Sequence, residues 1–174
     1  MKKKAVLILF MIFTINGYTQ KVNTDKSKVT LKIRNVGLMV KGSFEGLQAE
    51  IKIDDADLFG SMFNWSVESK TLNTKNKERD EEWKTGNYFN TEEYSQIIFR
   101  SDTIEKTPEG YNVLGKFKIK NRSTRVKIPV IVISEKNKTI FKGQFFVIRR
   151  NYDFATANMQ LANKMTFVFE IVIE

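Results

Sequence analysis

The chain contains 174 residues, with 29 Lys and Arg against 20 Asp and Glu, and it contains neither cysteine nor histidine. The absence of these two residue types excludes disulfides, thiol nucleophiles, zinc fingers, iron–sulfur sites and every catalytic site that depends on imidazole. A chain of this length is expected to form one domain, and its 14 Phe, 5 Tyr and 2 Trp indicate a large apolar interior rather than a disordered protein.

The first twenty residues have the pattern of a secretory signal peptide. Three lysines follow Met1, an apolar run extends from Ala5 to Ile15, and small or polar residues complete the segment. The run is too short to cross a membrane as a helix. We therefore expect residues 1–20 to be removed on export, which would leave a periplasmic or secreted domain of residues 21–174. An uncleaved N-terminal anchor is the alternative.

Short segments of alternating apolar and polar residues follow and predict β-strands, because alternation places one face on a core and the other in solvent. Val126–Ile133 is nearly all apolar, which predicts a strand covered on both faces. The predicted strands are residues 29–34, 38–44, 48–53, 63–67, 96–104, 111–119, 126–133, 139–147 and 165–173. Their short connections favour an antiparallel barrel or sandwich.

Residues 74–94 interrupt the strands and predict a short helical insert. Asn76 is a suitable N-cap for a helix over Lys77–Lys84, and Gly86 would end that helix. Thr91–Tyr94 has the features of a second single turn, with a threonine cap followed by acidic residues. We expect this insert to cover one mouth of a barrel.

The insert and the strand after it resemble the signature of the YceI-like family. Residues 79–101 read RDEEWKTGNYFNTEEYSQIIFRS, which is similar to the family's R-D-x-x-L, D-F-F and D/N-x-x-x-Y-P-x-I-x-F-x-S run. Residues 41–47, 115–119 and 149–154 are similar to its G-x-F-x-G, G-x-L-x-I and R-x-D-F-G elements. Trp83 replaces a leucine of the pattern and Ser95 replaces a proline. The resemblance extends over almost all of residues 21–174.

This resemblance implies an all-β fold, an extended antiparallel lipocalin-like β-barrel with a short helical insert between strands. It also implies an exported protein that holds a polyisoprenoid or other long-chain amphiphile in a hydrophobic interior, for transport or storage. No catalytic residues are implied, so we expect neither an enzyme nor a cofactor. Alternation alone does not separate a lipid tunnel from a filled core. A filled barrel that acts as a structural or stress-response interaction module is therefore the second hypothesis.

Aromatic residues on the apolar phase of the strands are the candidate ligand-binding residues, and core packing is the alternative for each. They are Trp65, Phe99, Tyr111, Phe117, Phe141, Phe145, Phe167 and Phe169.

Charged residues near the insert and in residues 149–154 are expected to form structural ion pairs at the barrel mouth. Arg79 would pair with Asp80, and Asp153 with Arg149 or Arg150. The partners expected are an isoprenoid or fatty amphiphile, no nucleic acid and no metal, with at most peripheral membrane contact; a homodimer is left open. The alternation of Lys and Arg with apolar residues is typical of a solvated strand face rather than of a nucleic-acid platform.

Overall fold

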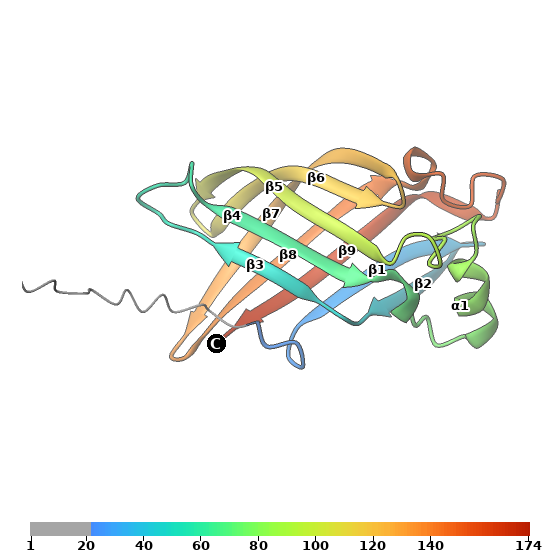
Figure 1. Ribbon diagram of the computed structural model, residues 1–174, viewed down its shortest axis with the longest axis horizontal. Helices are drawn as coiled ribbons and strands as arrows, with labels where there is room; N and C mark the ends of the chain where they lie inside the picture. Colours follow the sequence, from blue (N-terminus) through green and yellow to red (C-terminus); the bar gives the residue numbers. More distant parts are fainter. Residues whose placement is uncertain (1–21) are drawn as a thin grey trace, which may run out of the picture.

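Nine antiparallel strands form a single sheet that curls into an incompletely closed barrel (Figure 1). The structure is a computed structural model that describes residues 22–174, so the predicted signal peptide at residues 1–20 lies outside the described residues. The strands are β1 (Lys28–Asn35), β2 (Leu38–Phe44), β3 (Gln48–Lys52), β4 (Met62–Glu68), β5 (Gln96–Thr107), β6 (Gly110–Ile119), β7 (Arg122–Glu135), β8 (Lys138–Ile148) and β9 (Leu161–Ile173). Their order across the sheet is β2-β1-β9-β8-β7-β6-β5-β4-β3.

Every predicted strand is present, and the all-β barrel class is confirmed. The strands β5, β7 and β9 extend beyond the predicted bounds, because pairing with neighbours continues past the alternating segments. The edge strands β2 and β3 follow each other in the chain. Near their junction the Glu68 amide donates to the Glu45 carbonyl at 3.0 Å, and Ser43 of β2 bridges to Asn73.

The outer face of β7 corrects one expectation from the sequence. Ile131 is 45% exposed and Ile133 is 37% exposed, whereas Ile128 and Val130 are buried. The strand therefore has one covered face and not two. The reason is that the barrel wall is a single sheet, so an apolar residue on its outer side meets solvent unless another element packs over it.

The short helix α1 (Lys77–Lys84) lies at one end of the barrel, as Figure 1 shows. The Asn76 side chain accepts a hydrogen bond from the Arg79 amide at 2.9 Å, which confirms the predicted N-cap. The helix ends at Thr85, one residue before the predicted glycine. The single turn that follows begins at Asn90 rather than Thr91, since the Asn90 carbonyl accepts from the amides of Glu93 and Tyr94.

Aromatic packing attaches the insert to the end of the barrel. The ring of Trp83 stacks on Tyr88, and both meet the edge of Phe154. Phe89 lies between Phe154 and Phe44 of β2, with ring centroids 4.7 and 5.8 Å away. These contacts place the insert over one mouth of the barrel. Among residues 22–174, no helix is long and apolar enough to cross a membrane.

Candidate functional site

The barrel interior contains a cluster of aromatic rings contributed by five strands. Seven of the eight predicted ligand-binding residues lie there, each 6% exposed or less: Trp65, Phe99, Phe117, Phe141, Phe145, Phe167 and Phe169. Period-2 alternation brings them together, because each occupies an inward position of β4, β5, β6, β8 or β9. Phe63 of β4 belongs to the same cluster, with its ring 5.6 Å from Phe141 and 5.7 Å from Phe169. The sequence could have indicated Phe63, because it lies two residues before Trp65 and therefore faces the same side of β4.

Trp65 lies at the centre of this cluster. Its ring centroid is 6.0 Å from Phe99, 5.9 Å from Phe117, 6.4 Å from Phe145 and 5.7 Å from Phe169. Strand register produces part of this arrangement, since Trp65 is paired with Phe99 and Phe99 with Phe117. At this level the rings pack directly against one another. A ligand chain can lie here only if some of the rings rotate away from their present contacts.

The indole nitrogen of Trp65 is buried and has no hydrogen-bond partner. Among the side-chain polar atoms of residues 22–174, this nitrogen and the amide oxygen of Asn35 are the two that are buried without a partner. Buried polar groups in native proteins are nearly always paired, so each unpaired one requires an explanation. The Trp65 donor is the one that lies within the aromatic cluster.

Two glycines make room for rings on the inner face of the sheet. Gly143 of β8 is paired with Phe169 of β9, and a Cβ atom at Gly143 would lie 2.3 Å from the Phe169 ring. A Cβ atom at Gly115 of β6 would lie 2.8 Å from the ring of Phe99 and 2.2 Å from the Arg100 carbonyl. The absence of a side chain at Gly143 and at Gly115 therefore leaves the space that the rings of Phe169 and Phe99 occupy.

Tyr111, the eighth predicted residue, lies apart from the central cluster. Its hydroxyl donates to an Asp55 carboxylate oxygen at 2.8 Å, and the other oxygen accepts from Lys106 at 2.5 Å. Burial and the bond to Asp55 raise the pKa of Tyr111 to about 12. The bonds from Lys106 and Tyr111 lower the pKa of Asp55. Tyr111 thus fastens the loop between β3 and β4, at the end of the barrel away from α1 (Figure 1).

The expected ion pair between Arg79 and Asp80 is replaced by contacts of both residues with Thr74. The Arg79 guanidinium donates to the Thr74 hydroxyl at 2.9 Å and to its carbonyl at 3.1 Å. Asp80 accepts from the Thr74 amide at 2.8 Å and from its hydroxyl at 2.6 Å. Consecutive helical side chains point in different directions, and the buried Thr74 lies where both can reach it. Arg79 and Asp80 therefore hold the start of the insert in place by their separate hydrogen bonds with Thr74.

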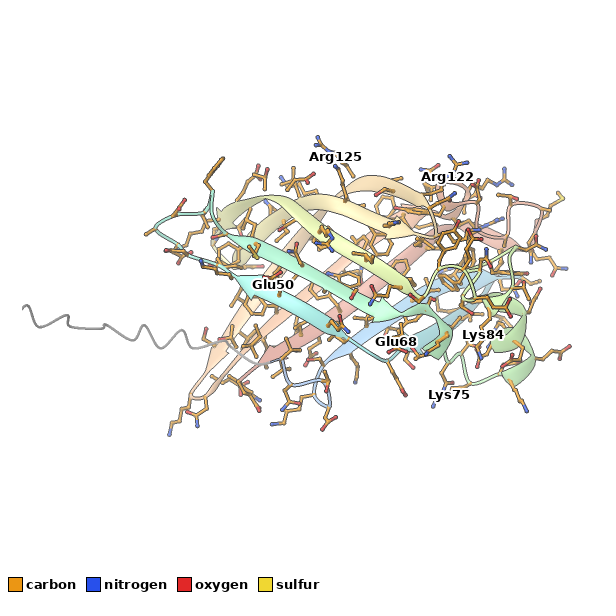
Figure 2. The ribbon with its side chains drawn as sticks, viewed as in Figure 1. Glu50, Glu68, Lys75, Lys84, Arg122 and Arg125 are labelled. Carbon is orange, nitrogen blue, oxygen red and sulfur yellow. The ribbon has the colours of Figure 1, made fainter. Side chains whose placement is uncertain are left out.

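Asp153 pairs with Arg122 of β7 at 2.8 Å, which corrects the expected pairing with Arg149 or Arg150. Figure 2 shows Arg122 on the outer side of the barrel, and Arg150 is also exposed. Arg149 instead points inward and is 1% exposed. Its guanidinium donates to five backbone carbonyls, those of Phe154, Ala155, Asn158, Leu161 and Ala162.

The sequence does not directly indicate that Arg149 is buried. The available signal was its phase, since it continues the inward positions of Phe145 and Val147 beyond the end of β8. A charged residue on an inward phase needs several hydrogen-bond partners, and the segment after η2 (Arg149–Tyr152) supplies them.

A groove of about 470 Å³ on the outer surface lies where β7 and β8 separate. The two strands pair only from Val130 with Gly143 to Glu135 with Lys138. Pro129, Ile131 and Gln144 contribute to the groove, and so does Phe169, a member of the aromatic cluster. The sequence did not indicate this groove, because the groove depends on where β7 and β8 stop pairing with each other.

The YceI-like domain model matches residues 20–173. A UPF0312 protein of Photorhabdus laumondii is 27% identical over 108 residues, which are 62% of this chain and 54% of the relative. The chain thus spans about half the length of this curated relative.

Two solved structures share the fold. The crystal structure of Burkholderia cenocepacia BcnA has a TM-score of 0.82 at 23% identity and covers 87% of this chain and 99% of that chain. A polyisoprenoid binding domain from Saccharophagus degradans, implicated in plant cell wall breakdown, has a TM-score of 0.72 at 10% identity. That match covers 90% of this chain and 98% of that chain.

Proposed function

Because the chain belongs to the YceI-like domain family, we propose that it binds a polyisoprenoid or another long-chain amphiphile inside its barrel and carries or stores it after export. The observation that supports this role best is the cluster of inward aromatic rings contributed by β4, β5, β6, β8 and β9. The description of the Saccharophagus degradans domain as polyisoprenoid-binding agrees with it. In this role the chain binds its ligand and does not transform it.

A ligand chain would replace contacts between rings by contacts between rings and methylene or isoprene groups. Burial of roughly 500 Å² of ligand apolar surface contributes about 12 kcal/mol at about 25 cal/mol per Å². The loss of ligand freedom and the rearrangement of rings oppose this gain, which leaves affinities in the ordinary micromolar to nanomolar range. The groove at the separation of β7 and β8 is the proposed entry, since Phe169 contributes to both the groove and the cluster.

Lipid extraction tests this proposal directly. The protein is expressed with residues 1–20, purified without detergent and extracted with organic solvent under denaturing conditions, and the extract is examined by mass spectrometry. A long-chain amphiphile in stoichiometric amount is expected. If no lipid is extracted and fluorescent prenyl and fatty-acid probes also fail to bind, the carrier function is wrong.

Two adjacent phenylalanines of β8 provide a matched pair of variants. Phe145 is 5% exposed and faces the interior, whereas Phe146 is 56% exposed on the outer face. Phe145→Leu should alter lipid retention or chain-length preference while the fold remains intact, and Phe146→Leu should not. Equal retention in both variants would contradict a ligand within the cluster.

One observation favours a second candidate function, a filled barrel that serves as an interaction module. Trp65 is 2% exposed and packs against four phenylalanine rings. For a filled barrel, Phe145→Leu should only reduce stability, by about 1–1.5 kcal/mol, and the extract should contain no lipid.

Export is the remaining part of the proposal and is supported by the basic and apolar order of residues 1–20. Intact-mass measurement of the protein from the periplasm or the medium should give a first residue near Gln20 or Lys21. A cell-associated product that retains Met1 would contradict it.

A further inference from the structure

The indole N–H of Trp65 is a hydrogen-bond donor in the middle of an interior made of hydrocarbon. Trp65 lies at the centre of β4 and is 2% exposed, and its Nε1 has no partner. The rings closest to it belong to phenylalanines, which offer no oxygen or nitrogen acceptor. Buried tryptophans usually pair this N–H, so the environment of Trp65 departs from the common pattern.

The barrel wall offers this donor no acceptor. β4 pairs with β3 on one side and with β5 on the other, so the carbonyls beside Trp65 belong to backbone ladders. The side chains that face Trp65 from β6, β8 and β9 are Phe117, Phe145 and Phe169. A phenylalanine at position 65 would bury a similar ring without an unpaired donor. An acceptor for the tryptophan therefore has to come with the ligand.

Resting on the proposed function, we infer that Trp65 donates a hydrogen bond to the ligand and selects amphiphiles with a neutral acceptor oxygen, such as a carbonyl, within the part of the molecule that enters the barrel. The acceptor is neutral because the buried cationic side chains of residues 22–174 are Lys120 and Arg149, and both donate to backbone carbonyls. A buried phosphate or carboxylate with a single N–H donor would remain largely uncompensated. The buried Arg149 is already occupied by backbone carbonyls.

A series of fatty acids of equal length tests this inference. Octadecanoic acid is compared with oxo-octadecanoic acids whose ketone lies at different carbons, by displacement of a fluorescent fatty-acid probe. A ketone lowers the hydrophobicity of the chain, so without a specific contact every oxo acid should bind more weakly. We expect one ketone position to bind about five- to tenfold more tightly than octadecanoic acid, the fold-change of a single hydrogen bond.

Two tryptophan variants distinguish a specific contact from packing. Trp65→Phe should abolish the preference for the oxo acid, so that octadecanoic acid then binds more tightly than every oxo acid. Trp83→Phe is the control, because Trp83 packs in the insert against Tyr88 and Phe154 and should retain the preference. An equal loss of both affinities in Trp65→Phe would overturn the inference, since it would mean that the ring only packs.

The infrared stretch of a ¹³C-labelled ketone gives a measurement that does not depend on any variant. Bound to the wild-type protein, the preferred oxo acid should show a carbonyl band at lower frequency than in an alkane solvent, as expected for a hydrogen-bonded carbonyl. An unshifted band overturns the inference even if Trp65→Phe does not fold. If octadecanoic acid binds and all oxo acids bind more weakly, the inference is wrong and the proposed function stands. If neither acid binds, the inference falls, and the proposed function falls with it only if prenyl probes also fail to bind and no lipid is extracted.

Discussion

Replacing Arg149 by methionine should destabilise the protein by about 4–6 kcal/mol, among the largest effects of any single substitution. The side chain is 1% exposed, and its guanidinium donates at 3.0 Å to the Phe154 carbonyl, at 2.5 Å to that of Asn158 and at 3.1 Å to that of Leu161. It also donates to the carbonyls of Ala155 and Ala162. These bonds hold the segment that connects η2 to β9.

The magnitude follows from the number of carbonyls that lose a charged donor. A hydrogen bond to a charged group contributes about 1.5–3 kcal/mol, and five of them would sum to about 7.5–15 kcal/mol, as much as the whole free energy of unfolding of a typical domain. The sum overestimates the loss, because Asn158 and Ala162 are only half-buried and their carbonyls can turn towards water. Two or three hydrogen bonds therefore count at their full value, which gives the expected loss of about 4–6 kcal/mol. Arg149→Lys retains the charge but offers fewer donors, all on one nitrogen. We therefore expect this variant to lose about 2–3 kcal/mol of stability.

Urea unfolding followed by tryptophan fluorescence measures this loss, and Arg150→Met is the matched control. Arg150 is the next residue and is exposed, so its replacement should cost about 0.5 kcal/mol or less. Burial lowers the pKa of Arg149, but arginine remains protonated near neutral pH, so the difference should not depend on pH there. If Arg149→Met and Arg150→Met unfold at the same urea concentration with equal slopes, the assigned role of Arg149 is wrong.

Three further substitutions test the turn, the packing and the titration of single residues. Val36 has a φ of +47° in the β1–β2 turn, so Val36→Asn should raise stability by about 0.5–1 kcal/mol in urea unfolding; a loss would contradict the turn geometry. Gly143→Ala should cost about 1–3 kcal/mol because its Cβ would meet the Phe169 ring, whereas Gly86→Ala, with open space, should be nearly neutral by thermal melting. The raised pKa of Tyr111, about 12 against 10.0 unfolded, means that the folded state holds this proton more tightly, so stability should fall as pH rises from 10 to about 12. Part of that fall should be missing in Tyr111→Phe, and an unchanged profile would exclude the contribution of this tyrosine.

Local patterns in the sequence were sufficient for the strands, the helix cap and the inward rings. Alternation with a period of two determines which residues of a strand share a face, as with Phe167 and Phe169 of β9. The Asn76 cap depends on one side chain and an amide three residues later. These features involve neighbours in the chain, so they were readable before the fold was known.

Tertiary structure decided which faces and which charges meet. The pairing of Asp153 with Arg122 joins residues 31 positions apart, and it depends on where η2 places the aspartate beside β7. The exposure of Ile131 depends on the outer face of β7 meeting solvent, which an apolar run does not specify.

The unpaired N–H of Trp65 has the same origin. Its inward position was readable from the strand, but the absence of an acceptor depends on which side chains four other strands contribute around it. Sequence alternation therefore determined that position 65 is buried, and only the assembled barrel decided what its side chain meets. The physical reason is that burial follows from a local period, whereas hydrogen-bond partners depend on the distances between segments that are remote in the chain.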